Sequence, residues 1–190
     1  KLFKFIGIYH FRSKIVECPN FEFKAVQKRN DNLYDKKIVK YAESILDNRF
    51  KLFSYYSFHF TEDNLWNIDP FSKKIISNQL HWSKIKIYKD LDIKNVWEMS
   101  RWTWMPILSM AFRITGDIKY LKKIEFLISN WGKNNPINRG INWVCGQEIS
   151  IRLIHLFQTI KILYPLEEIK LNISESQFVF LHLKRIFLTL

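Results

Sequence analysis

The sequence predicts a mainly α-helical protein built of helical hairpins, preceded by an irregular, aromatic-rich N-terminal part. Gly and Pro are scarce, at five each, whereas a sandwich or barrel needs many tight turns. Hydrophobic residues make up 47% of the 190 residues and aromatic residues 16%, which suits a packed core and excludes a disordered chain. From residue 96 onward, apolar residues recur at helical spacing and turn residues separate the runs.

The N-terminal third alternates between weak and irregular patterns. Residues 1–35 show no steady period, and residues 36–47 carry apolar side chains at helical spacing, which predicts one helix. Residues 50–60 are aromatic and partly alternating, which favours one or two short strands. Residues 61–94 are expected to be irregular, with a turn at Asp69-Pro70. Such a long connection is usually functional or wraps over a core.

Turn and cap residues divide the rest of the chain into helices. Gly116 suits the end of a first helix, and Asp117 is a good N-cap for the second. Asn142 is a possible N-cap of the third helix. Ser174 and Gln177 form a capping-box pattern that opens a fourth. The expected helices are residues 96–114, 118–131, about 142–163 and a last one from 174 to 190.

The third expected helix is apolar around almost its whole circumference, which predicts burial between neighbours. One narrow polar stripe interrupts it, formed by Glu148, Arg152, His155 and Thr159 at spacings of four, three and four. The stripe could face a wet cavity, or it could be an internal ion pair of Glu148 with Arg152 beside a hydrogen-bonded core histidine. For His155 the core role is favoured; for the pair both interpretations stay open.

The first expected helix contains a crowded group of aromatic and charged side chains. Glu98 and Arg101 are three residues apart and can pair. Trp97, Arg101 and Trp104 share a helical face. Tryptophan is mostly a core residue, but beside an arginine it also makes a platform for a sugar ring and its acidic group.

The net charge and the cysteine content limit the kinds of binding partner and cofactor that are expected. The net charge is +12, from 30 Lys+Arg against 18 Asp+Glu, which attracts nucleic acid, an anionic membrane surface or an acidic polysaccharide. The charge is scattered, however, and also fits a merely Lys- and Asn-rich composition. Cys18 and Cys145 lack metal-ligand spacing, so free thiols and no metal or other cofactor are expected. Neither a membrane-spanning run nor a clear secretory signal is seen.

Several short motifs resemble those of one known family. Residues 96–101 (VWEMSR) and 111–117 (AFRITGD) resemble the "WE-SR … A-Y-TGD" signature of heparinase II/III family proteins. Further pieces follow the family's "SW…NP…G-NW…G-E-A-R" run. They are residues 129–131, 135–136, 140–143 and 146–152. Upstream pieces also come in the family's order, namely Trp66, Asp69-Pro70, His81-Trp82 and residues 92–94. The resemblance covers roughly residues 50–163.

The resemblance implies a polysaccharide lyase, or a lyase-like protein of a cell-surface polysaccharide locus. Such proteins have an N-terminal incomplete (α/α) toroid and a C-terminal β-sandwich. They cleave acidic sugars by β-elimination, in which a neutralised uronate carboxylate lowers the pKa of the C5 proton and Tyr or His groups transfer protons. Residues 1–48 are then an N-terminal segment with one helix. Residues 49–190 begin the toroid, without its later part or the sandwich. A periplasmic or cell-surface location is implied.

The family's catalytic Asn-His pair, Tyr and further His come later than the matched region, so no catalytic residue is expected within this chain. As a whole polypeptide it would lack lyase activity; as a fragment, it would leave activity to the missing part. An uncovered helix face at the C-terminal end should expose an apolar patch. The expected substrate contacts, which could instead fix hairpin packing, are Arg101, Trp104, Asn142, Trp143, Gln147, Glu148 and Arg152.

Three functions are compatible with the sequence. The first is a lyase-type toroid domain that binds acidic polysaccharide. The second is a catalytically inactive, carbohydrate-binding or structural member of the same family. The third is a basic helical module that binds nucleic acid or protein; it requires a Lys/Arg stripe on one exposed face. It ranks last because the basic residues are spread over several segments, and nucleic acid is not an expected partner.

Overall fold

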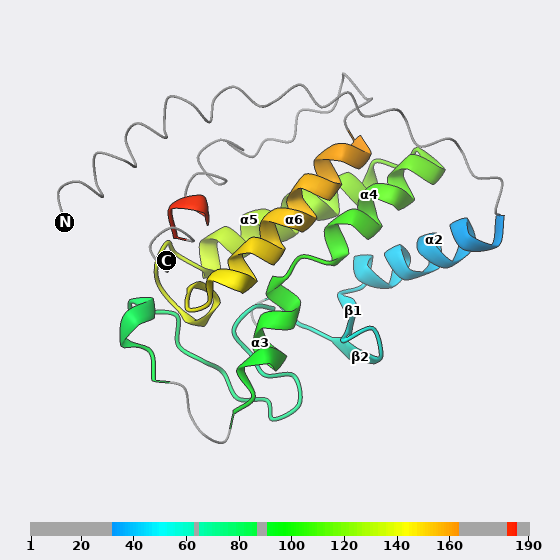
Figure 1. The fold of residues 1–190 in the computed structure, drawn as a ribbon. Helices are drawn as coiled ribbons and strands as arrows, with labels where there is room; N and C mark the ends of the chain where they lie inside the picture. The colour runs from blue at the N-terminus through cyan, green and yellow to red at the C-terminus, as the bar shows by residue number, and fades with distance from the viewer. Residues whose placement is uncertain (1–31, 63–64, 87–90, 164–181, 186–190) are drawn as a thin grey trace, which may run out of the picture.

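The computed structural model describes residues 32–62, 65–86, 91–163 and 182–185 (Figure 1). These residues are mainly helical, as the sequence predicts. The expected helix from Ser174 onward falls mostly outside them, and so does most of the C-terminal end for which an exposed apolar patch is predicted. The elements are α2 (Asn32–Leu46), β1 (Arg49–Leu52), β2 (Tyr56–His59), the 3-10 turn η2 (Trp82–Lys84), α3 (Ile93–Ser100), α4 (Trp104–Thr115), α5 (Lys119–Asn134), the 3-10 turn η3 (Ile141–Trp143) and α6 (Gly146–Leu163).

Helix α4 lies at the centre of the molecule. It packs against α2, α5 and α6, and Figure 1 shows these helices alongside one another, with α3 and the β1–β2 hairpin at one end. Helix α2 therefore shares one core with the later helices. That core is formed by buried side chains of all four helices, among them Ala42, Ile45, Leu108, Ala111, Ile124, Leu127, Ile149 and Leu156.

The prediction of one continuous helix over residues 96–114 is wrong. Helix α3 ends at Ser100 and α4 begins at Trp104, because Trp102 adopts a left-handed conformation with φ 61°. The indole of Trp102 is fully buried, edge to face against Trp131 with ring centroids 5.0 Å apart. Pro106 is the third residue of α4, where its missing N–H leaves no helical hydrogen bond unmade. Burial of the indole and this proline both favour a fresh start at Trp104.

The second helix follows its predicted pattern. Gly116 ends α4 in the left-handed region at φ 75°, a conformation that glycine adopts without a Cβ penalty. The Asp117 carboxylate accepts a hydrogen bond from the backbone N–H of Lys119 at 3.0 Å, at the start of α5. The predicted apolar face is buried throughout, through Tyr120, Leu121, Ile124, Leu127, Ile128 and Trp131.

Two short strands form where the aromatic segment predicted them. Strands β1 and β2 pair antiparallel, with Phe50 opposite Phe58. The following irregular region contains the predicted turn, in which the Asp69 carboxylate accepts bonds from the Phe71 backbone N–H at 2.9 Å and the Ser72 hydroxyl at 2.7 Å. These two bonds fix the turn beside the hairpin without regular secondary structure.

Helix α6 starts later than expected and is less buried. It begins at Gly146, and Asn142 lies in η3, so the N-cap role predicted for Asn142 is wrong. The prediction of burial around the whole helix is also wrong, since Ile154 and Phe157 are 53% and 51% exposed. Within the described ranges, no helix has the length and apolar character needed to cross a membrane.

Candidate functional site

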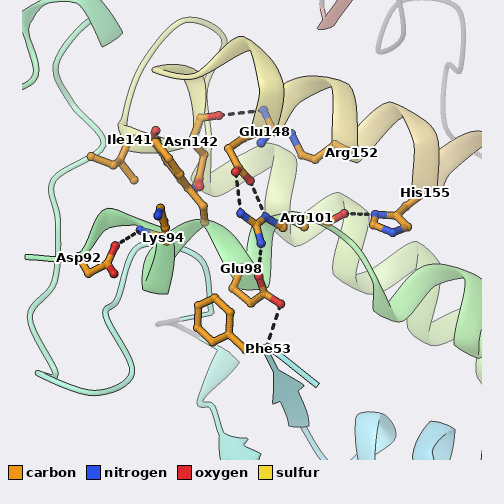
Figure 2. Close-up of polar contacts among 11 residues, drawn as sticks. Phe53, Asp92, Lys94, Glu98, Arg101, Ile141, Asn142, Glu148, Arg152 and His155 are labelled. Atoms are coloured by element: carbon orange, nitrogen blue, oxygen red, sulfur yellow. Dashed lines mark hydrogen bonds and ion pairs between the residues drawn. The ribbon is translucent and has the colours of Figure 1, made fainter. Parts of the chain in front are cut away.

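An arginine between two carboxylates joins α3 to α6 (Figure 2). The Arg101 guanidinium donates to Glu148 twice, from Nε to Oε2 and from Nη2 to Oε1, both at 2.7 Å. Its Nη1 donates to Oε2 of Glu98, one turn earlier in α3. The other Glu98 oxygen accepts the backbone N–H of Phe53 at 3.0 Å. We call Glu98, Arg101 and Glu148 the clamp, because together they tie the hairpin, α3 and α6.

The clamp is buried on one side only. The side chain of Glu148 is 6% exposed, that of Glu98 11% and that of Arg101 23%. Its hydrogen bonds to Glu148 hold the pKa of the Arg101 guanidinium above the ordinary range, although burial opposes this. A guanidinium has five N–H groups, and three are used within the clamp. Arg101 is therefore fixed, charged and in contact with solvent.

The predicted pairing is half right. The Glu98–Arg101 pair, three residues apart, is confirmed. The internal Glu148–Arg152 ion pair, one of the two interpretations left open for the polar stripe, does not form, because both oxygens of Glu148 are bound by Arg101, 47 residues away in sequence. A planar guanidinium matches a carboxylate with two parallel bonds, and Arg101 approaches from a neighbouring helix in that geometry. Arg152, one turn after Glu148 on the same helix, does not approach the carboxylate in this geometry.

Arg152 lies instead in a cage of aromatic rings. It is 1% exposed and donates to the backbone oxygen of Asn142 at 2.8 Å and to Nε2 of His182 at 3.3 Å. Burial lowers the pKa of its guanidinium, against the attraction of Glu148. Aromatic ring faces favour a cation. Three of them surround the guanidinium at 5.0 to 5.9 Å from their centroids, those of Trp102, Trp131 and Trp143.

Asn142 and Trp143 are tied into the same buried network. The Asn142 amide donates to Oδ1 of Asn135 at 2.8 Å and to the backbone oxygen of Trp66 at 3.1 Å. The Trp143 indole N–H donates to the backbone oxygen of Asn135 at 3.2 Å. These bonds fix the loop before α6, and so the position of Glu148.

The entry to that loop requires a glycine. Gly140 has φ 82° and ψ 172°, a region that is essentially restricted to glycine. A Cβ at this position would lie 3.0 Å from the Cβ and 3.1 Å from the Cα of Asn78. The close approach brings the irregular 61–94 region onto the loop that carries Asn142.

His155 supports the break between α3 and α4. Its Nδ1 lies 2.6 Å from the backbone oxygen of Arg101 (Figure 2). This contact satisfies a carbonyl at the end of α3, where the helix no longer provides a partner. His155 is half-buried and hydrogen-bonded, in line with the core role favoured from the sequence.

The seven predicted contacts divide by exposure. Arg101 and Gln147 reach the surface. The other five lie between 0% and 4% exposed, which places them beneath the surface of the described residues. They are Trp104, Asn142, Trp143, Glu148 and Arg152. Arg101 and Gln147 are therefore the two predicted contacts that a ligand from solvent could meet, and Glu148 is the buried residue that holds Arg101.

Two residues of this network escaped the sequence analysis as site residues. Asn135 takes part in three of its hydrogen bonds and is 2% exposed. Its signal was present in the Asn135-Pro136 motif of the family resemblance, for which no substrate contact was predicted. Trp102 supplies a wall of the arginine cage, and its only sequence signal is the crowding of tryptophans around it.

The described residues thus form a helical domain in which tryptophan, asparagine and arginine side chains make a buried network. The chain belongs to the heparinase II/III family, since the family model described as Heparinase II/III N-terminus matches residues 4–168. No curated protein matches the sequence.

Two solved structures share the fold. They are heparan sulfate lyase HepC from Pedobacter heparinus and a mutant of it. Each is 18% identical, with a TM-score of 0.50 over 95% of this chain and 26% of that chain. The chain thus spans about a quarter of the length of these structures, and the likeness concerns the fold.

Proposed function

We propose that this chain is the helical domain of a polysaccharide lyase that binds acidic, uronate-containing polysaccharide at the exposed side of the clamp. Residues 49–190 would begin an incomplete (α/α) toroid. The proposal assigns substrate binding to these residues and assigns them no step of the β-elimination. The family membership and the fold shared with a heparan sulfate lyase support this proposal, as does the net charge of +12. A periplasmic or cell-surface location would suit such a substrate.

The observation that carries the proposal is the state of Arg101. Of the two arginines among the predicted contacts, Arg101 is the one whose side chain remains in contact with solvent, because Arg152 is 1% exposed. Its two N–H groups outside the clamp can bind a carboxylate or a sulfate. Because the clamp holds the guanidinium in one orientation, little conformational entropy is lost when a ligand binds. Gln147, the exposed residue that precedes Glu148 in the sequence, would offer an amide to sugar hydroxyls.

The clamp would contribute geometry rather than net charge. One guanidinium faces two carboxylates, so the anion attraction at long range must come from the surrounding lysines and arginines. At short range, the fork of Arg101 would orient an acidic sugar toward the residues that perform the elimination. Fixed orientation of this kind is a large part of rate acceleration in enzymes.

Binding can be tested with heparan sulfate, alginate and hyaluronan oligosaccharides by calorimetry. Arg101→Ala should weaken binding by about tenfold or more, the worth of a charge-assisted hydrogen bond. Gln147→Ala, at an exposed position, should weaken it several-fold without affecting folding. Arg113→Ala, an exposed arginine at the end of α4, is the matched control and should bind as the wild type does. Equal affinity in all three variants would refute the proposed site.

A second candidate is a non-catalytic carbohydrate-binding member of the family. The observation that favours it is the burial of five of the seven predicted contacts, four of which take part in hydrogen bonds within the site. The two candidates differ in turnover by the full-length polypeptide that carries this sequence. A lyase should raise the ultraviolet absorbance of unsaturated uronate on at least one uronate polymer. Binding without any such rise would favour the second candidate.

A further inference from the structure

An exposed aromatic surface lies on the β1–β2 hairpin and the turn beside it. Tyr55 is 81% exposed, Tyr56 47%, Phe71 45% and Phe53 38%. We call these four residues the aromatic patch. Exposed rings in this number cost hydration free energy, and the packing of the helices does not require them.

Three of the four rings of the patch, those of Tyr55, Tyr56 and Phe71, are held by contacts between rings. Tyr55 packs edge to face on Tyr56 at 5.0 Å, and Tyr56 on Phe71 at 5.1 Å. Phe71 in turn packs on the half-buried Phe58 at 5.0 Å, with an interplanar angle of 80°. Phe58 reaches the buried Phe60. These ring contacts connect the exposed rings to the core, so the rings are preorganised for a ligand.

The backbone beneath the patch is strained. Phe53 and Ser54 have φ values of 53° and 60°, and Lys73 has 60°. Residues with a Cβ disfavour this region, and hairpin turns of this kind normally use Asn or Gly. Such strain persists where the surrounding structure enforces it, typically at binding sites. Here the Phe53 N–H is held by the carboxylate of Glu98 at 3.0 Å.

This same contact joins the patch to the clamp. Glu98 accepts Phe53 with one oxygen and Arg101 with the other (Figure 2). From Phe53 to Tyr56 the chain spans at most about 10 Å. The ammonium of Lys73 lies 5.5 Å from the ring centroid of Phe58, which places a positive charge beside the rings. One hydrogen bond thus links the clamp to the first residue of the aromatic patch, and Lys73 places a cation beside its rings.

We propose that the aromatic patch binds successive sugar rings of an acidic polysaccharide that extends away from the clamp. The apolar C–H faces of pyranose rings would stack on Tyr55, Tyr56 and Phe71, because the negative faces of aromatic rings attract weakly positive C–H groups. Lys73 would pair with a carboxylate or sulfate on the same chain. The proposal rests on the proposed function for the polysaccharide itself and adds where the chain runs.

Chain length makes the patch testable separately from the clamp. A disaccharide can occupy the clamp alone, whereas a long oligosaccharide also reaches the patch. The variants are Tyr55→Ala and the double variant Tyr55→Ala/Tyr56→Ala, and Tyr34→Ala is the matched control because Tyr34 is 60% exposed on α2. Tyr55→Ala protects the test against misfolding, since this side chain is almost wholly in solvent. Calorimetry with size-defined uronate oligosaccharides gives the affinities.

The double variant should lose about tenfold in affinity for long oligosaccharides and keep its affinity for the disaccharide. Tyr34→Ala should match the wild type for both ligands.

Unchanged binding by the double variant, together with weakened binding by Arg101→Ala, would overturn the role of the patch and leave the proposed function standing. Weakening by the double variant alone would support the patch and overturn the role of Arg101. A wild type that binds no acidic oligosaccharide would overturn both. A loss of affinity that accompanies a change in oligomeric mass would overturn the patch in favour of contact between copies.

Discussion

Removal of Arg101 should destabilise the fold, because it leaves Glu148 without its only bidentate partner among the described residues. The side chain of Glu148 is 6% exposed and both its oxygens bind Arg101 at 2.7 Å. In Arg101→Ala the Glu148 carboxylate would lie without its cation in a site with little access to water. Glu98 would keep its bond to Phe53 and lose its cation.

The magnitude follows from the burial of the pair. Loss of one partner of a buried ion pair costs about 3 to 5 kcal/mol. Arg101 is 23% exposed, so water can replace part of the interaction and the expected loss in unfolding free energy is about 2 to 4 kcal/mol. With a urea dependence of about 2 kcal/mol per molar, the unfolding midpoint should fall by about 1 to 2 M.

Urea unfolding, followed by tryptophan fluorescence, measures this in a double-mutant cycle. The cycle compares Arg101→Ala, Glu148→Gln and the double variant, with Arg113→Ala as a control expected within about 0.5 kcal/mol of the wild type. The coupling between the two sites should be about 2 kcal/mol, because the neutral amide that replaces the Glu148 carboxylate needs no cation. A loss below about 1 kcal/mol in Arg101→Ala, or strictly additive effects, would refute the clamp as a stabilising unit.

Three further perturbations test other parts of the structure. Gly140→Ala should cost about 3 kcal/mol, since both φ and the close neighbour oppose a Cβ, whereas Gly116→Ala, with open space around it, should cost about 1 kcal/mol; equal thermal shifts would contradict this. The Tyr120 hydroxyl, 2.6 Å from Glu43, lowers the pKa of that carboxylate below its ordinary 4.5. The ionised Glu43 carboxylate therefore stabilises the fold at a pH above its ordinary pKa, and this contribution is lost as the pH falls through the lowered pKa. The difference in unfolding free energy between the wild type and Glu43→Gln should shrink between neutral pH and about pH 3. A difference that does not depend on pH would argue against the Tyr120–Glu43 pair. Trp102→Ala should lower the unfolding free energy by about 4 kcal/mol, because the buried indole leaves a cavity; a loss under about 1 kcal/mol would show that its cage does not depend on it.

Much of the fold is readable from local pattern. The helix predicted over residues 118–131 is confirmed as α5 (Lys119–Asn134), because Gly116 and Asp117 indicate its start and a single face carries its apolar residues. The break at Trp102 was not predicted, because a favourable helical pattern runs through it. Only the tertiary burial of one indole, together with Pro106 in the next turn, outweighs that pattern.

The sequence predicted the residues of the site better than it predicted which of them pair with one another. Sequence spacing correctly joins Glu98 to Arg101, since both lie on α3 and its end. It wrongly joins Glu148 to Arg152, because spacing along one helix carries no information about a guanidinium on another. The aromatic patch also escaped notice. Its rings come from a hairpin and a separate turn, and alternation in a strand predicts which side chains share a face, not which rings remain exposed.

Titration of the protein with a uronate hexasaccharide tests the binding role of Arg101 most directly, with the Arg101 Nε–Hε signal followed by nuclear magnetic resonance. That N–H is held by Glu148, so it should give a distinct signal that reports on the guanidinium. We expect this signal to shift in a saturable and salt-sensitive way while the signal of Arg113 stays in place. An unchanged Arg101 signal at a hexasaccharide concentration that shifts other arginines would contradict polysaccharide binding at the clamp.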